Sequence, residues 1–433
     1  MKLLNTFTTF NLIILVVMTI LYFYQIVYIG IGLKKKNAGA AEPARTMHHY
    51  AAFISARNES HVISELLDSL QKQNYPHDLL DVFVLADNCT DNTAEISRQH
   101  GAYVYERFDQ KQVGKGYALD YLYHHVIKDH GHQEYEGFFV FDADNIVDPD
   151  FVRSMNDTFD TGKYEAVTCY RNSKNFATNW LSAAYSIWFL REARFVNYPR
   201  MLLGTSCMIS GTGFLVSSKL MEENHGWPYH LLTEDIQFSV NCALSGHMIG
   251  YCDSAVVFDE QPTTFKQSYK QRLRWSKGFY QIDSRYVFPL MKGMTHKNRA
   301  MSCYDVLMTV APAMLLTLAA IGINVWALLA ATSMPHYIRI LFQREASEYL
   351  LWSAIFYYLG MVMLASLTVF SEWKRIPCTS WQKIKYIWVF PLFILSYIPI
   401  TLQALFTKVT WTPIEHYSCA QLSMAQEHHH HSN

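Results

Sequence analysis

Charged residues are scarce in this chain. They make up 17% of its 433 residues, whereas hydrophobic residues make up 50%, and a soluble domain usually carries about a quarter charged residues. This shortage indicates a membrane protein. Because the mean hydropathy is close to zero, the apolar residues must be concentrated in parts of the chain. We therefore expect one soluble block and several membrane spans.

No charged residue lies between Lys2 and Lys34. This stretch exceeds the roughly 20 residues that cross a bilayer, and it lacks the small-residue cleavage site of a signal peptide, which is the alternative. Residues 1–36 are therefore predicted to be a transmembrane helix with a basic flank. Because basic residues stay on the cytoplasmic side, the amino terminus is expected outside.

Residues 37–299 lack any apolar run long enough to span a membrane. We expect a cytosolic catalytic domain over residues 37–260 and interfacial helices over residues 261–304. Residues 305–406 would form membrane helices and an interfacial segment, and residues 407–433 a tail. The terminal EHHHHSN resembles a tag remnant and is left out of the functional argument.

Within the membrane region, residues 306–332 and 349–370 are the predicted spans. Together they would form an outward-going hairpin, separated by a short segment in which two arginines and two glutamates balance (Arg339, Arg344, Glu345 and Glu348). The basic stretch EWKRIPCTSWQKIKY favours a cytosolic interfacial helix. Residues 388–406 are apolar but contain two prolines, and they fit either a full span or a re-entrant segment.

The sequence also has no cysteine spacing that would indicate disulfide bonds. The eight cysteines form no CxxC pair and show no regular spacing, so reduced structural thiols are expected.

Strands and helices alternate in the soluble block, beginning with the apolar residues 50–54. This pattern predicts an α/β fold with a parallel, doubly wound sheet, whose ligands bind beyond the carboxyl ends of the strands. A single polar residue at a strand end is often only a helix cap or turn residue. Here they recur at three strand ends, which indicates one site: Arg57, Asn58, Glu59, Asp87, Asn88, Asp142 and Asp144.

Two short motifs in this block suit a phosphate-containing ligand. In DADN, Asp142 and Asp144 offer oxygen ligands to Mg²⁺ or Mn²⁺ bridging a diphosphate. In VGKGYALD, Lys115 opens a helix between glycines and suits a phosphate, although a surface turn explains it equally well. The GxxxxGK[ST] spacing of a P-loop is absent.

Two further motifs have two interpretations each. In TEDIQFS, Glu234 and Asp235 begin a helix, where they would complement its dipole or provide a general base. In QRLRWSKGF, basic residues surround Trp275. Such a helix suits an anionic lipid surface, or an arginine that neutralises a leaving diphosphate while the tryptophan stacks on a sugar.

The ordered set SARNE, DNCTDNT, GKGYAL, DADN, SGTGF, TED and QRLRW, over residues 53–279, resembles the family 2 glycosyltransferases. It is most similar to their processive membrane branch, which contains cellulose, chitin and hyaluronan synthases. The resemblance implies a cytosolic GT-A-like domain inserted between α-helical transmembrane segments. It also implies a UDP-sugar donor, a growing glycan acceptor, surrounding membrane lipids, inversion at the anomeric carbon and a β-linked product. Nucleic acid is not an expected partner.

The resemblance also assigns roles by position. Asp235, beside Glu234, would be the catalytic base. Asp142 and Asp144 would bind the diphosphate, with Asp144 the more direct metal ligand. The donor would contact Arg57, Asn58, Glu59, Asp87, Lys115, Asp142 and Arg274. The acceptor would contact Ser210, Gly211, Thr212, Gly213, Gln271, Arg272 and Trp275.

Two departures and one faint likeness qualify the comparison. Asn145 stands where several cellulose synthases carry histidine, and no large regulatory domain is present. The tail FTKVTWTPIEH faintly resembles a gating segment, which would need Trp411 and His416 in the cytosol and would favour the re-entrant form of residues 388–406. An irregular polar tail is the alternative.

The favoured function is polymerisation of a β-glucan from UDP-glucose and its translocation across a bacterial-type plasma membrane. Two alternatives remain open. One is a synthase of the chitin, poly-N-acetylglucosamine or hyaluronan type, and the other is a non-processive enzyme that glycosylates a membrane lipid.

Overall fold

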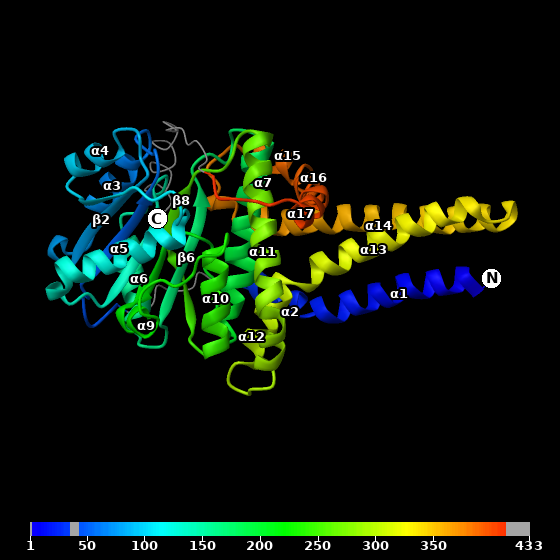
Figure 1. The fold of residues 1–433 in the computed structure, drawn as a ribbon, viewed down its shortest axis with the longest axis horizontal. Helices are drawn as coiled ribbons and strands as arrows, with labels where there is room; N and C mark the ends of the chain where they lie inside the picture. The colour runs from blue at the N-terminus through cyan, green and yellow to red at the C-terminus, as the bar shows by residue number, and fades with distance from the viewer. Residues whose placement is uncertain (1, 35–42, 413–433) are drawn as a thin grey trace.

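A sheet with its helices lies at one end of the protein, and three long helices project from it at the other (Figure 1). The computed structural model describes residues 2–34 and 43–412. The projecting helices are α1 (Lys2–Tyr22), α13 (Pro312–Ala330) and α14 (His336–Ser371). The separation follows the charge distribution, because the apolar runs can pack only against one another or against lipid.

The sheet has eight strands in the order β3-β2-β1-β4-β7-β6-β8-β5. Its central strands are continuous apolar runs, as expected for strands covered on both faces. The strands are β1 (Tyr50–Ala56), β2 (Leu80–Asp87), β3 (Tyr103–Arg107), β4 (Gly137–Asp142), β5 (Ile146–Val147), β6 (Ala166–Ser173), β7 (Phe214–Ser217) and β8 (Ile249–Asp259).

The sheet is mixed, so the prediction of an all-parallel sheet was wrong in part. β7 runs antiparallel to both β4 and β6, and β5 runs antiparallel to β8, while the remaining neighbours are parallel. The reason lies in the segment before β7. In this segment the carbonyl of Ser210 accepts a hydrogen bond from Arg171, near the carboxyl end of β6. Because the chain is already at this end of the sheet before β7 begins, β7 runs in the direction opposite to β6.

Helices cover both faces of the sheet. One face packs on α5 (Lys115–His130) and α7 (Trp180–Glu192), and the other packs on α3 (Ile63–Gln71) and α6 (Phe151–Phe159). Smaller helices complete the layers: α4 (Thr93–Gln99), α8 (Tyr198–Leu202), α9 (Ser218–Glu223) and α10 (Glu234–Ser245). Both faces are therefore buried, and the polar side chains collect at the strand ends.

Two further helices stand between the sheet and the projecting helices (Figure 1). They are α11 (Phe265–Gly293), which carries the QRLRW motif, and α12 (Ala300–Val310). These two helices connect the two ends of the molecule.

Two helices are long and apolar enough to cross a membrane, namely Ala300–Ala331 and His336–Ser371. They contain the two spans predicted after the soluble block. A bent pair, Phe7–Tyr22 with Tyr24–Leu33 at 43°, covers the predicted first span. The expected outward hairpin is shorter than predicted. Arg344 and Glu348 form an ion pair inside α14, because charges of opposite sign four residues apart favour a helix.

The last described segment is a second bent pair, Ser380–Ile387 with Phe390–Phe406 at 42°. It contains α15 (Ser380–Ile387), α16 (Phe390–Leu395) and α17 (Tyr397–Phe406). Figure 1 shows these helices at the base of the projecting ones. Lys277 of α11 donates to the carbonyl of Ala404 at 2.9 Å, so α17 packs along α11. The bent pair fits either a broken span or a re-entrant segment.

A buried ion pair joins the soluble part to the apolar helices. Arg200 of α8 donates to both carboxylate oxygens of Asp305 in α12, at 2.7 and 2.9 Å, and both side chains are 1% exposed or less. Tyr28 of α2 (Tyr24–Leu33) donates to the same carboxylate at 2.7 Å. Three elements distant in sequence therefore share one buried carboxylate.

We expect Arg200→Met to lower the free energy of unfolding by about 3–5 kcal/mol, because it leaves Asp305 buried without a counter-ion. Thermal unfolding in lipid nanodiscs measures this. Arg344→Met, which breaks an exposed pair, is the matched control and should cost less than about 1 kcal/mol. Equal effects of the two substitutions would contradict the assigned role of the buried pair.

Candidate functional site

The carboxyl ends of the parallel strands open into one cavity of about 620 Å³. This is the size of a cofactor or nucleotide site. Most of the residues predicted from strand ends and motifs line it together: Arg57, Glu59, Asp87, Lys115, Asp142, Asp144, Ser210, Gly211, Glu234, Asp235, Gln271, Arg274, Trp275 and Trp411. The cavity thus brings together residues separated by more than half of the chain.

The DADN loop is held by hydrogen bonds to the glycine-rich SGTG segment. The backbone N–H of Asp142 donates to Thr212 Oγ1 at 2.9 Å, and Thr212 also bonds to Asn145. Asn145 is fully buried, and its amide donates toward Asp144 and Asp259 at 3.4 and 3.3 Å. Asn145 therefore holds two acids side by side, a role that only a hydrogen-bond donor can take.

Arg171 and Asp259 belong to the site but were not predicted from the sequence. Arg171 lies near the end of β6 and Asp259 ends β8, and Arg171 Nε donates to Asp259 Oδ2 at 2.9 Å. Burial disfavours ionisation of Asp259, but the Arg171 guanidinium and further hydrogen bonds more than compensate and lower its pKa. Asp259 accordingly stays negative. Neither residue lies in a recognisable motif, and only the strand order brings these ends beside β4.

Lys115 connects the acid loop to the glycine segment. Its ammonium group bonds to Asp142 and donates to the carbonyl of Gly211 at 2.6 Å. The helix behind it packs closely, because a Cβ on Gly116 would collide with the backbone of Tyr229. The lysine is therefore fixed at a helix amino terminus, where backbone amides also favour an anion.

Asp87 is positioned by a residue further along the chain. Arg107 at the end of β3 donates from Nε to Asp87 at 2.8 Å and from Nη2 to the carbonyl of Gln112 at 2.6 Å. It thereby ties the second strand end to the loop that leads into Lys115. Arg107 is a third residue that sequence reasoning missed, because it lies in no motif.

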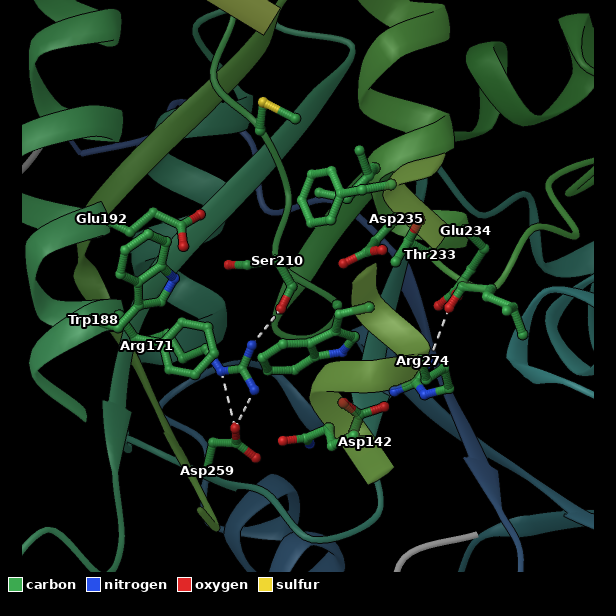
Figure 2. A pocket seen from close by; sticks show the side chains of 18 of the residues that line it. Asp142, Arg171, Trp188, Glu192, Ser210, Thr233, Glu234, Asp235, Asp259 and Arg274 are labelled. Atoms are coloured by element: carbon green, nitrogen blue, oxygen red, sulfur yellow. Dashed lines mark hydrogen bonds and ion pairs between the residues drawn. The ribbon is translucent and has the colours of Figure 1, made fainter. Parts of the chain in front are cut away.

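Glu234 and Asp235 begin α10 at the cavity wall (Figure 2). Burial, together with the neighbouring Asp235 carboxylate, raises the pKa of Glu234 to about 7. Burial also raises the pKa of Asp235, although Lys115 and Arg274 oppose the shift. A Cβ placed on Gly211 would lie 3.5 Å from Asp235 Oδ2, so only a small residue leaves room for a ligand beside this carboxylate.

The QRLRW motif divides between two faces of α11. Gln271, Arg274 and Trp275 have helical spacing and line the cavity. Arg274 donates to the carbonyl of Leu232 at 2.9 Å, which fixes it beside Glu234. Trp275 packs edge-on against Tyr185, with ring centroids 5.9 Å apart.

Arg272 faces away from the cavity, so its position does not fit the predicted contact with an acceptor. It is fully buried and donates to the carbonyl of Phe393 at 3.1 Å and to Ser396 Oγ at 2.5 Å. These contacts hold the helix pair at the base of α14 against α11. Arg272 follows Gln271 directly, and one residue step turns a side chain by about 100° around the helix axis, so it points away from the cavity that Gln271 lines.

Three other predicted residues support the wall from behind. Asn58 lies outside the cavity and accepts from the backbone N–H of Thr90 at 2.8 Å. Thr212 and Gly213 also lie behind the lining, and a Cβ on Gly213 would collide with the Cys169 sulfur at 2.5 Å. These residues shape the loops that carry the acids.

The tail returns to the cavity. Trp411 lines it, and the Arg57 guanidinium lies 5.3 Å from the Trp411 ring centroid. This contact fits the predicted gating segment as far as Trp411. His416 lies outside the described residues.

From the acids, the cavity continues toward the apolar helices. Beyond Asp235 and Ser210 its walls are formed by α7, by the junction of α1 and α2, by the start of α13 and by α14. The lining there mixes polar and apolar side chains: Tyr22, Tyr24, Gln25, Trp188, Arg191, Glu192, Met308, Thr309, Ala313, Tyr357, Met361, Leu364 and Ile394. One continuous space thus connects the strand ends with the predicted membrane helices.

The acids at the end of β4 suit a hard divalent cation. Mg²⁺ is usually held by one or two carboxylates together with substrate phosphates, and Asp142 and Asp144 provide two carboxylates at the cavity wall. Within residues 2–34 and 43–412 no cluster of three or more acids, histidines or cysteines could hold a metal.

Comparisons with known proteins agree with this geometry. A family profile described as glycosyltransferase like family 2 matches residues 48–278. The chain is 28% identical over 272 residues to a beta-monoglucosyldiacylglycerol synthase from Nostoc sp., covering 60% of this chain and 55% of that protein. It is 26% identical over 240 residues to a poly-beta-1,6-N-acetyl-D-glucosamine synthase from Staphylococcus epidermidis, covering 55% and 56%. The chain thus spans about half the length of these relatives.

Among solved structures, the fold is similar to that of a mannosyltransferase from Pyrobaculum calidifontis in complex with GDP-Man and Mn²⁺. The TM-score is 0.54 at 16% identity, covering 84% of this chain and 98% of that one. This likeness concerns the fold, and it confirms the expected GT-A-like α/β domain, with a mixed sheet.

Asp144→Asn should weaken Mn²⁺ binding in the presence of UDP by about tenfold or more, because it removes an ionised oxygen ligand. Isothermal titration in nanodiscs measures the affinity. Asp150→Asn, at an exposed position before α6, is the matched control and should bind Mn²⁺ as the unmodified protein does. Unchanged Mn²⁺ affinity in Asp144→Asn would remove this residue from the metal site.

Proposed function

We propose that this chain, which belongs to the glycosyltransferase like family 2, is a membrane-embedded, inverting enzyme that extends a β-linked glycan from a UDP-sugar. The observation that carries this proposal is the single cavity that joins the acids at the strand ends to the predicted membrane helices. A donor at the acids and an acceptor entering from the helices would meet beside Asp235.

Donor binding is supported by the charges along the cavity. The cations Arg57, Lys115 and Arg274 line it together with Asp142 and Asp144. The cations complement a diphosphate directly, whereas the two acids would repel it without a divalent cation. Bound there, Mg²⁺ or Mn²⁺ would neutralise the diphosphate. Trp411 over Arg57 would cover the donor from the tail side.

Asp235 is the general base in this proposal. Its carboxylate would take the proton from the acceptor hydroxyl as that oxygen attacks the anomeric carbon and the sugar–phosphate bond breaks. Attack opposite the leaving diphosphate inverts that carbon, so an α-linked donor gives a β-linked product. Because burial raises the pKa of Asp235, the active, deprotonated form should increase as the pH rises through this raised pKa.

Trp275 is the proposed platform for the acceptor sugar. It lines the cavity between the acids and the predicted membrane helices, and its edge-on packing against Tyr185 fixes its orientation. A fixed aromatic face suits stacking on a sugar ring. The polar side chains further along the cavity favour passage of a hydrated glycan, because polar groups within membrane helices commonly line such paths.

UDP-glucose is the proposed donor and a β-glucan the proposed product. The TED and QRLRW motifs favour a glucan or chitin type of synthase over a hyaluronan type, and the Nostoc relative is named for a glucosyl lipid. UDP-N-acetylglucosamine remains the rival, since the Staphylococcus epidermidis relative is named for poly-N-acetylglucosamine. The choice depends on contacts with the sugar.

A second candidate is transfer of one sugar to a membrane lipid. The apolar part of the cavity wall favours it, because Met308, Met361, Leu364 and Ile394 would accept an acyl chain. In that case the sugar acceptor would be a lipid headgroup, and the donor half of the site would work in the same way.

Asp235→Asn should reduce transfer by at least about a hundredfold, because it removes the proton acceptor. UDP affinity should stay within about twofold of the unmodified value, since the carboxylate acts on the acceptor. Radiolabel transfer and calorimetry with UDP measure the two effects. Asp253→Asn, at an acid outside the cavity lining, is the control. Robust product formation by Asp235→Asn would exclude it as the base.

Supplying nanodiscs with individual radiolabelled UDP-sugars and Mg²⁺ or Mn²⁺ should give a polymer that a β-glucan-specific glycanase degrades. Trp275→Ala should shorten the product because the acceptor loses its stacking surface. Gel filtration measures chain length. A single sugar on an extracted lipid, with no polymer, would select the second candidate, and unchanged chain length in Trp275→Ala would leave this residue as an interfacial anchor only.

A further inference from the structure

Glu192 is an acid in the cavity wall for which neither the sequence motifs nor the proposed chemistry has a role. It is the last residue of α7 and lines the cavity opposite Asp235. Figure 2 shows the two carboxylates facing the same space from opposite walls. Trp188 lies one helical turn earlier on the same face, because residues four apart in a helix are neighbours. It also lines the cavity.

The arginines around Glu192 are occupied elsewhere. Arg171 bonds to Asp259, and Arg200 bonds to Asp305. Arg191 points toward Gln25, at 3.2 Å from its side-chain oxygen, and its guanidinium lies 5.2 Å from the Trp188 ring centroid. Burial raises the pKa of Glu192 even though all three arginines oppose the shift. The carboxylate is therefore poorly compensated by the protein.

Three acids elsewhere in the structure have a close hydrogen-bond or ion-pair partner. Asp259 is bonded to Arg171, Asp305 to Arg200, and Glu372 accepts from Tyr170 at 2.8 Å. Glu192 is half-buried in the cavity wall and faces the space that a ligand would fill, so hydrogen bonds from a bound ligand would replace those that the carboxylate makes to water. A carboxylate only accepts hydrogen bonds, and sugar hydroxyls donate them.

The backbone after Glu192 fixes its direction. Residues Ala193–Asn197 form a π-helical turn between α7 and α8, and such turns frequently occur at functional sites. The turn is held by α2, because Gly32 packs so closely that a Cβ there would collide with the Phe195 ring. The turn that follows Glu192 is thus held by contacts with the first predicted membrane span.

We propose that Trp188 and Glu192 form a second acceptor subsite. Trp188 stacks on the sugar that follows the one bound at Trp275, and Glu192 accepts hydrogen bonds from the hydroxyls of that second sugar. This inference rests on the proposed transfer to a glycan. An aromatic face and a hydrogen-bonding carboxylate one turn apart match a pyranose, which offers an apolar face and equatorial hydroxyls. An acyl chain would offer no donor to Glu192.

The subsite predicts how the rate depends on acceptor length. A disaccharide acceptor reaches Glu192, whereas a monosaccharide at Trp275 does not. The full chain in nanodiscs is given radiolabelled UDP-glucose, Mg²⁺ and β-linked glucose acceptors of one, two or three sugars. The unmodified protein should show a higher kcat/KM for the disaccharide than for the monosaccharide.

Glu192→Gln should lower kcat/KM for the disaccharide by about tenfold or more, because it removes a charged hydrogen-bond acceptor. Transfer to the monosaccharide, hydrolysis of the donor and the KM for the donor should all stay within about twofold. Trp188→Ala should reduce the same disaccharide advantage. Glu222→Gln, an exposed glutamate of α9, is the matched control and should change none of these values.

Three results would overturn the subsite. The first is a Glu192→Gln variant that keeps the full disaccharide advantage in kcat/KM. The second is an equal loss of rate with every acceptor and in donor hydrolysis, which would show a structural effect. A wild-type protein that hydrolyses UDP-glucose but transfers to no glycan would refute the proposed function together with the inference. In the first two results the wild-type protein still elongates glycans, so the two failures are distinguishable.

Discussion

The buried contact between Arg200, Asp305 and Tyr28 is the constraint on which the rest of the arrangement depends. It joins α8 of the soluble part to α12 and α2 at the start of the apolar helices. Since a buried carboxylate needs its partners, the relative position of these elements is fixed. The cavity crosses this junction, so its continuity from the strand ends to the helices depends on the same contact.

Within the cavity, some acids form an ion pair with a basic side chain and others do not. Lys115 bonds to Asp142, and Arg171 bonds to Asp259. Glu234 and Asp235 lie together at a helix start, where burial raises both pKa values. Perturbed acids of this kind are typical of catalytic sites. The acids with raised pKa values lie along the proposed path of the acceptor.

The difference between a polymerase and a lipid glycosyltransferase depends on the far half of the cavity. The donor half is built from sheet ends and is compatible with both. The far half is formed by α7, α11 and the apolar helices, where Trp188, Glu192 and Trp275 lie near Met361 and Ile394. A glycan needs the aromatic and polar groups, whereas a lipid needs the apolar ones. The identity of the acceptor is therefore a property of the helices.

The sequence by itself predicted the spans, the α/β block and the acids at the strand ends, because each depends on local features. Apolar runs, alternating periodicity and the DADN, TED and QRLRW motifs are contiguous in the chain. Residues selected by strand order were missed: Arg171, Asp259 and Arg107 come from strand ends that carry no motif. The antiparallel β7 was missed for the same reason.

Tertiary structure alone decided how the motifs divide. It placed Arg272 on the side of α11 that faces away from the cavity and Trp275 on the side that lines it. It also brought Trp411 next to Arg57, from which it is separated by most of the chain. It also set Glu192 opposite Asp235. These placements result from packing between elements far apart in sequence, and packing depends on the shape of both partners. The sequence determined which chemistry is available, and the fold decided which of its groups share one space.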